Sequence, residues 1–235
     1  MADNQNKRPR TTVVLAMSVD GKIADVKRSP ARFSSVADQT HLEQQIATAD
    51  AVLFGAGTLR TYETTLSISN PQLLQQRAKH NLPSQPVQIV ASLSAHIDPQ
   101  IRFFRQPINR WLLTTTIGAK KWKNSTDFER ILVSETPAAI GIDWVSALQQ
   151  LATLGISHLA VLGGGELVAS LIADDLIDEF WLTICPLILG GADAPTPVEG
   201  TGFSPEDLAP RLQLLSVETI NEEVFLHYRR QRAED

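Results

Sequence analysis

Residues 159–167, LAVLGGGEL, decide the fold of this chain of 235 residues. Apolar residues run directly into Gly163, Gly164 and Gly165, and a helical pattern begins at Glu166. A buried strand that turns through glycines into a helix leaves backbone N–H groups at the helix start, where the helix dipole adds positive charge. Three glycines exceed what one turn needs, because each costs backbone entropy on folding. The junction therefore predicts a phosphate site, with a plain strand-to-helix turn as the alternative.

A second junction of strand, glycines and helix lies at residues 50–58, DAVLFGAGT. An apolar run ends on Gly55 and Gly57, and Thr58 follows either as a helix cap or as a phosphate contact. Arg60 stands where a dinucleotide fingerprint has its third glycine, so the Rossmann signal is weak. Ligands of open α/β sheets bind at the carboxyl ends of strands, so a dinucleotide that contacts both junctions is the economical prediction.

Apolar runs and helical patterns alternate along the remaining chain. Besides those at the two junctions, the pattern predicts strands at residues 11–17, 87–91, 110–115, 130–134, 178–186, 212–219 and 223–229. The helix at 143–154 has Asp143 as its N-cap, Gly155 after its C-terminus, and Val145, Leu148 and Leu151 on one face. The pattern predicts an α/β fold with a mostly parallel central sheet, helices on both faces and a C-terminal antiparallel hairpin.

Length and composition predict one domain over residues 11–230, preceded by a disordered polar tail at 1–10. The net charge of -5 argues against a nucleic-acid partner. The single cysteine, Cys185, excludes a disulfide framework and a Cys-rich zinc site, and it is expected to be a core residue. No metal site is expected. No apolar run approaches the roughly 20 residues of a membrane-spanning helix, and no signal peptide is visible, which predicts a cytoplasmic protein.

Two kinds of chemistry find no support in the sequence. Nucleophilic catalysis would need a pattern such as G-x-S-x-G, which is absent, and the five histidines have no suggestive spacing. A zinc deaminase needs H-x-E with P-C-x-x-C, and a single cysteine rules out the second half. Hydride transfer by a bound cofactor needs little beyond positioning, so it fits the two junctions better.

Three stretches carry a resemblance to a known family: AMSVDGKIA at 16–24, ADAVLFGAGT at 49–58 and VLGGGELVASLIADDLIDEFWLTICPLILGG at 161–191. Here the chain resembles the reductase domain of riboflavin biosynthesis, the C-terminal part of bifunctional deaminase–reductases, which has the dihydrofolate reductase fold. The resemblance implies an NADPH-dependent 5-amino-6-(5-phosphoribosylamino)uracil reductase. Such an enzyme reduces the ribose to a ribityl chain by hydride transfer and acts as a homodimer.

The resemblance also implies roles for individual residues. The expected cofactor-binding residues are Ala16, Gly55, Gly57, Thr58, Ser92, Gly163, Gly164, Gly165, Glu166 and Leu167. The expected substrate-binding residues are Phe33, Leu66 and Leu162. No catalytic residue is assigned, because Asp20 in the SVDG turn is better explained as a turn residue.

The chain departs from the family at three positions. Ile46 and Ser69 stand where the family has arginines, and Leu162 stands where it has a glutamate. Without those arginines a substrate phosphate loses charge-assisted hydrogen bonds. The nearby cations available to replace them are Arg32, Arg60 and Arg77. Two alternatives therefore stay open: reduction of a pterin or another heterocycle, or NADP binding without catalysis.

Preference for NADPH over NADH requires a cation near the adenine ribose, where the 2′-phosphate lies. Arg60, Lys120 and Lys121 are the candidates, because each stands near the end of an expected strand.

Overall fold

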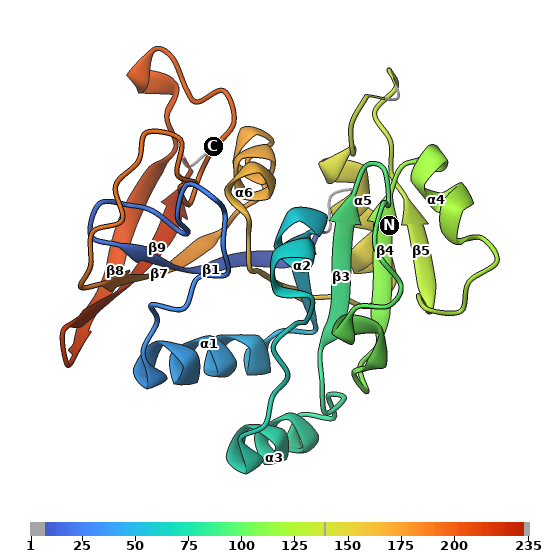
Figure 1. Ribbon diagram of the computed structural model, residues 1–235, viewed down its shortest axis with the longest axis horizontal. Coiled ribbons are helices and arrows are strands. Elements are labelled where there is room, and N and C mark those ends of the chain that lie inside the picture. The colour runs from blue at the N-terminus through green and yellow to red at the C-terminus, as the bar shows by residue number, and fades with distance from the viewer. Residues whose placement is uncertain (1–7, 139, 233–235) are drawn as a thin grey trace, which may run out of the picture. The chain divides into compact units, whose positions relative to one another are not determined.

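The computed structural model describes residues 8–138 and 140–232 (Figure 1). The chain divides into two compact units, one of residues 1–10 and 43–160 and the other of residues 11–42 and 161–235. The single domain over 11–230 therefore stays a prediction. Most of the expected N-terminal tail, residues 1–7, lies outside the described residues, whereas Arg10 already belongs to a strand.

The first unit holds a sheet with strand order β5-β4-β3-β2-β6. Its elements are β2 (Ala51–Gly55), α2 (Ala56–Tyr62), α3 (Pro71–Lys79), β3 (Val87–Ser92), η1 (Arg102–Arg105), β4 (Arg110–Thr114), α4 (Thr116–Trp122), β5 (Arg130–Val133), α5 (Trp144–Thr153) and β6 (His158–Val161). The pairs β2–β3, β3–β4 and β4–β5 are parallel, with Gly55 beside Ala91 and Ala91 beside Leu113. The carboxyl ends of these strands therefore lie at one edge.

Local capping signals fix two helices of this unit. Asn70 accepts a hydrogen bond from Gln72 N at 2.9 Å at the start of α3, and Asp143 accepts one from Ser146 N at 2.9 Å at the start of α5. The predicted N-cap of α5 is confirmed. The predicted buried face is wrong at one position, since Val145 is 44% exposed while Trp144 is buried. The buried stripe runs through 144, 147, 148 and 151, so the predictions for Leu148 and Leu151 are confirmed.

The second unit holds a sheet with strand order β1-β7-β9-β8. Its elements are β1 (Arg10–Ser18), the first half of α1 (Val36–Thr48), α6 (Gly165–Ala173), β7 (Glu179–Cys185), η2 (Glu206–Leu208), β8 (Arg211–Ile220) and β9 (Glu223–Gln231). β1 and β7 are parallel, β7 and β9 are antiparallel, and β8 and β9 form the antiparallel hairpin. The predicted α/β class with mostly parallel strands and a C-terminal hairpin is confirmed.

Helices cover both faces of the second sheet. His41 of α1 contacts Trp181 and Phe225, with ring centroids 4.8 and 5.1 Å apart. Gly163, just before α6, lies against Leu15, whose side chain points to the opposite face. Figure 1 shows α1 and α6 on opposite sides of β1 and β7. Among the described residues no helix is long and apolar enough to cross a bilayer.

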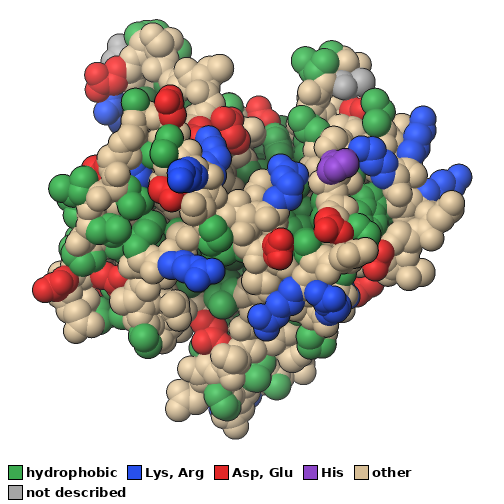
Figure 2. Space-filling view, viewed as in Figure 1, with side chains coloured by type: hydrophobic (Ala, Val, Ile, Leu, Met, Phe, Trp, Pro, Cys, Tyr) green, Lys and Arg blue, Asp and Glu red, His purple; other side chains and the backbone are tan. Residues whose placement is uncertain are grey.

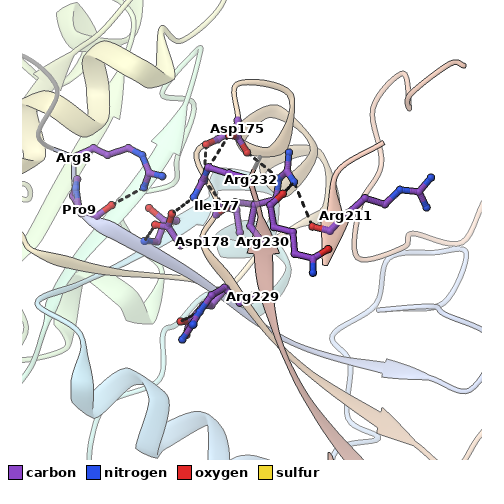
Figure 3. Close-up of polar contacts among 12 residues, drawn as sticks. Arg8, Pro9, Asp175, Ile177, Asp178, Arg211, Arg229, Arg230 and Arg232 are labelled. Carbon is purple, nitrogen blue, oxygen red and sulfur yellow. Dashed lines mark hydrogen bonds and ion pairs between the residues drawn. The ribbon is translucent and has the colours of Figure 1, made fainter. Parts of the chain in front are cut away.

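The C-terminal strand is anchored by ion pairs (Figure 3). Arg232 lies between Asp175 and Asp178, with N–O distances of 2.7 and 2.9 Å, and Arg230 pairs with Asp175 at 3.0 Å. Asp178 also accepts the backbone N–H of Thr11 at 2.9 Å. These contacts join the last strand to the start of the first, so they fix the register of β9 beside β7.

Candidate active site

The junction before α6 combines two different glycine requirements. Gly163 has a φ of +94°, in the left-handed region that side chains other than glycine rarely adopt. Gly164 is the N-cap residue, with φ -78° and ψ -173°, a conformation open to any residue. The peptide bond between them is cis. Leu167 N and Val168 N donate to Gly164 O at 3.0 and 3.2 Å, so intrahelical bonding begins there and the preceding N–H groups have no helical partner.

Gly165 is required by packing against the loop at 190–200. A Cβ at Gly165 would lie 2.3 Å from Thr196 O and 2.8 Å from Glu199 Cγ. Glu199 N also donates to Gly165 O at 3.2 Å, and its carboxylate pairs with Arg28 at 2.8 Å. The fold thus explains Gly163 and Gly165. The φ of Gly164 does not require a glycine, so backbone conformation gives no reason for the middle glycine of the run.

The other predicted cofactor-binding residues of the second unit differ in how accessible they are to a cofactor. Ala16 lies in β1 directly after Leu15, whose Cδ2 would be 3.1 Å from a Cβ on Gly163. Glu166 is exposed in the first turn of α6. Leu167 is buried and its N–H donates to Gly164 O, so both its side chain and its N–H have a structural role.

The junction at the end of β2 has a simpler geometry. Gly55 is the N-cap of α2, with φ -75° and ψ 151°, and no side chain caps the helix. Thr58 lies inside α2, so the capping alternative for Thr58 is wrong. Gly57 is exposed, and a Cβ there would meet only Arg60 Nη2, at 3.9 Å. This junction is open, and neither φ nor packing demands a glycine at position 57.

Ser92, the looser match, is engaged in a turn. Its side chain is buried and its Oγ accepts the N–H of Ala95 at 3.0 Å. Its carbonyl accepts from Thr114 Oγ1 at 2.6 Å. These bonds give Ser92 a local structural role at the carboxyl ends of β3 and β4.

One of the expected cations is structural. Arg77 is 1% exposed, and its guanidinium donates to the carbonyl oxygens of Pro83, Ala47 and Ala49 at 2.7 to 2.9 Å. Burial lowers the pKa of Arg77. The prediction that it replaces a lost substrate arginine is therefore wrong, since it is inaccessible to a ligand. Of the cations that the sequence proposed for ligand binding, the exposed ones are Arg32, Arg60, Lys120 and Lys121.

The predicted substrate residues fall in both units: Phe33 and Leu162 are half-buried in the second, and Leu66 is exposed in the first. Among the departures, Ile46 is a core residue. Ser69 donates its N–H and its hydroxyl to the carboxylate of Glu43. The loop at Ser69 is thus held by a negative charge, in place of the positive charge that the family carries there.

A buried acid pair is the feature that sequence reasoning missed. Asp38 in the first turn of α1 is 6% exposed, and Glu223 at the start of β9 is 4% exposed. Burial, above all, and the charge of Glu223 raise the pKa of Asp38, against lowering hydrogen bonds with Thr183 and Ser34. In the sequence, Asp38 resembles a helix-start residue and Glu223 half of an ordinary turn pair. The one signal available in the sequence was the predicted hairpin turn. Because that turn ends before Glu223, it places Glu223 in a strand and not in the turn itself.

The pair lies near the carboxyl ends of β1 and β7 in the second sheet. In the parallel register Ala16 faces Thr183 and Ser18 faces Cys185, so these groups share the carboxyl ends of β1 and β7. Burial, followed by the charges of Glu223 and Asp38, raises the pKa of the Cys185 thiol to about 12. The predicted core role of Cys185 is confirmed. A buried carboxyl group with a raised pKa holds its proton to higher pH than an exposed one, which is the direction that general acid catalysis requires.

Asp20 has a structural role, as the turn motif predicts. Its carboxylate accepts from Ser18 Oγ at 2.6 Å, from Leu189 N at 3.1 Å and from Gly190 N at 2.7 Å. The hydrogen bond from Ser18 is the largest cause that lowers the pKa of Asp20, to about 2. Asp20 therefore stays ionised and joins the first turn to the loop after β7. Among the described residues, no group of three or more His, Cys, Asp and Glu is arranged to hold a metal ion.

The surface charges are mixed on the face drawn in Figure 2. Basic and acidic side chains alternate there, with no continuous area of one sign. A groove for a nucleic-acid backbone would need a stripe of positive charge, which this face does not present.

Comparison with known proteins identifies relatives over nearly the whole chain. The family model of the RibD C-terminal domain matches residues 9–226. A 2,5-diamino-6-ribosylamino-4(3H)-pyrimidinone 5′-phosphate reductase of Methanothermobacter thermautotrophicus is 28% identical, covering 94% of this chain and 98% of the relative. The protein of the same name from Archaeoglobus fulgidus is 26% identical, covering 83% and 89%.

Solved structures share the fold at lower identity. A pyrimidine reductase-like protein of Corynebacterium diphtheriae has a TM-score of 0.79 at 18% identity, covering 95% of this chain and 92% of its own. The riboflavin biosynthesis reductase Rib7 of Saccharomyces cerevisiae has a TM-score of 0.71 at 16% identity, covering 98% and 93%. These likenesses support the predicted fold.

Proposed function

Because the chain belongs to the RibD C-terminal domain family, we propose that it is a nicotinamide-dependent reductase of a phosphoribosylamino-pyrimidine in riboflavin biosynthesis. The observation that carries the proposal is the family match over residues 9–226, which includes both glycine junctions and the buried acid pair. Two relatives that match this chain over most of their own length, 89% and 98%, are named as reductases of such a compound.

The junction before α6 fits the phosphates of the cofactor. Gly164 is the N-cap of α6 and no side chain caps the helix, so the first N–H groups of α6, with the helix dipole, favour an anion there. A nicotinamide cofactor bound there supplies the hydride. We propose NADPH, since the family resemblance implies it and Arg60 is an exposed cation beside the junction at Gly57.

We propose Asp38 as the proton donor. Reduction of a carbonyl or imine carbon adds a hydride to carbon and a proton to the oxygen or nitrogen. Asp38 is buried at the carboxyl edge of β1 and β7, and burial raises its pKa, the direction that favours the protonated form needed for that step. Its neighbours Thr183 and Ser34 orient the carboxyl by hydrogen bonds.

Two pyrimidines are candidate substrates, and they differ at one ring position. The family resemblance implies 5-amino-6-(5-phosphoribosylamino)uracil, with an oxo group at C2, whereas the relatives are named for the 2,5-diamino compound. NADPH oxidation measured with each compound, and with dihydropterin as a third arm, tests the proposal. Turnover of either pyrimidine supports it. The proposal would be overturned if neither pyrimidine is turned over at millimolar concentration, or if only the pterin is turned over.

The role of Asp38 has a separate test. Asp38→Asn should lower kcat on the order of a hundredfold, because an amide has no acidic proton to give. The dissociation constant for NADPH should stay unchanged, since the substitution keeps the shape. An unchanged kcat would remove Asp38 from the mechanism and leave the reductase assignment intact.

We propose a homodimer that buries one face of the C-terminal hairpin. Leu214 and Val217 on β8 are exposed, and Val217 pairs with the half-buried Leu226 on the same face. Trp181 stacks on His227 on the opposite face of the hairpin, with ring centroids 3.9 Å apart. Light scattering of Val217→Lys should show half the wild-type mass, whereas Glu218→Lys on the opposite face should not. The same mass for wild type and Val217→Lys would exclude this interface. The cytoplasmic location stays a prediction.

A further inference from the structure

Glu223 is bound to the segment that precedes α1. Ser35 N donates to Glu223 Oε1 at 3.1 Å, and Ser35 Oγ donates to Glu223 Oε2 at 2.5 Å. Both oxygens of this buried carboxylate accept hydrogen bonds from Ser35, and the carboxylate also has a side-chain hydrogen bond with Cys185. Ser35 follows Phe33 by two positions, so the same bonds hold the loop that carries a predicted substrate residue.

Ser35 in turn caps α1. Its Oγ accepts the N–H groups of Ala37 at 3.0 Å and Asp38 at 3.2 Å, and its carbonyl accepts Gln39 N at 3.0 Å. A serine in this role satisfies helix N–H groups that otherwise lack partners. The hydrogen-bond chain therefore runs from the carboxylate of Glu223 through the hydroxyl of Ser35 to the backbone of Asp38.

From this geometry we infer that Glu223 is a positioning residue for the proton donor: through its hydrogen bonds to Ser35 it sets the place of Asp38. The inference rests on the proposed role of Asp38. Glu223 does not contact the reacting atoms and acts through the two residues named.

Charge is the second part of the role. The titratable groups that face Asp38 are Glu223 from β9, Cys185 from β7 and His41 one turn along α1. Burial lowers the pKa of His41, and burial raises that of Cys185, so both stay neutral near pH 7. Glu223 is the charged member, and its negative charge raises the pKa of Asp38.

The expected effect on activity has a definite sign. An acid catalyst works in its protonated form, so kcat falls as pH rises through the pKa of Asp38. Glu223→Gln keeps the shape and removes the charge, so this decline should move to lower pH. At a pH on the declining side of the wild-type profile, kcat should be on the order of tenfold lower in Glu223→Gln, while the dissociation constant for NADPH should not change. Glu223→Asp keeps the charge but shortens the reach to Ser35, so its decline should stay near the wild-type pH.

A direct titration separates this inference from the proposed reaction. The carboxyl carbon of Asp38, labelled with ¹³C, is followed by NMR against pH in the wild type and in Glu223→Gln, without substrate. Glu222→Gln, in the same turn but exposed, is the matched control. A lower apparent pKa in Glu223→Gln alone supports the inference, even if neither pyrimidine is turned over.

Two results would overturn it. One is an identical Asp38 titration in the wild type and Glu223→Gln. The other is a loss of kcat and thermal stability in Glu223→Gln with an unmoved pH decline, which marks a merely structural residue. If Glu223→Gln does not fold, Ser35→Ala carries the test of positioning. It should lower kcat on the order of tenfold at unchanged NADPH affinity, and a wild-type kcat would count against the inference.

Discussion

The two glycine junctions are similar in sequence and differ in what their glycines do. Before α6, Gly163 is required by its φ of +94° and Gly165 by the loop that packs against it. Before and within α2, Gly55 has an ordinary extended conformation and Gly57 faces open space. The junction with more glycines is therefore the one where folding explains more of them.

The difference teaches how to weigh glycines as evidence for a ligand. A glycine that the fold requires says nothing about binding, because it would be kept without any ligand. The φ of Gly164 does not require a glycine, and a Cβ at Gly57 would meet only the end of the Arg60 side chain, so these two are the better evidence for backbone approach to a phosphate. Four substitutions test this distinction, from the largest expected effect to the smallest.

Gly165→Val should destabilise the protein by about 3 kcal/mol or more, because the new side chain meets the backbone of Thr196 and cannot be accommodated without moving the loop. Thermal or urea unfolding measures the change. Gly165→Ala, with a single added carbon, is the milder companion if the valine variant does not fold. Wild-type stability in both would show that the loop is free to move away.

Gly164→Val should weaken NADPH binding about tenfold, or about 1.4 kcal/mol, by placing a branched side chain where the phosphate approaches. Unlike Gly165→Val, it should leave the unfolding midpoint close to the wild-type value. Titration calorimetry gives the dissociation constant. If Gly164→Val binds NADPH with wild-type affinity, the phosphate site lies elsewhere. The glycines of neither junction would then be evidence for a ligand.

Gly57→Ala should stabilise the protein by about 0.5 to 1 kcal/mol, because alanine restricts the unfolded chain and favours helix at a position with space for it. If this junction also receives the cofactor, affinity should fall as stability rises. Opposite signs in the unfolding and binding measurements would confirm a binding role. A rise in stability with unchanged affinity would assign the junction to folding alone.

Arg60→Gln should lower the preference for NADPH over NADH about threefold, as expected for an exposed charge that contributes on the order of 0.5 to 1 kcal/mol. The effect should shrink at high salt. Lys79→Gln provides a control with an equally exposed cation on another helix, α3. If the wild type binds both cofactors equally, there is no preference for Arg60 to explain.

Most elements of the fold were predictable because their causes are local. Apolar runs indicated β1, β2 and β6, a three-residue turn indicated the C-terminal hairpin, and Asp143 capped the helix it was expected to cap. For the buried face of α5, the sequence predicted Val145 where the structure buries Trp144, because either residue continues a helical stripe with Leu148 and Leu151. Which of them is buried depends on the strands beneath the helix.

Burial of charge was beyond local reading. Arg77 looked like an available cation, but carbonyl oxygens from residues far along the chain surround it. Asp38 and Glu223 looked like ordinary helix-start and turn residues, yet they form a buried pair 185 positions apart in the sequence (223 − 38). A charged side chain is buried only where a distant segment supplies its partners, and those partners are set by packing.

The sequence by itself determined the elements, their order, the α/β class and the two junctions, because periodicity, capping and turn chemistry act between near neighbours. It also carried the family resemblance that implies a reductase. Only the tertiary structure decided which glycines serve folding, which arginine is structural and which carboxyl group is a proton donor candidate. Those properties depend on desolvation and on hydrogen-bond partners from segments that meet only when the chain folds.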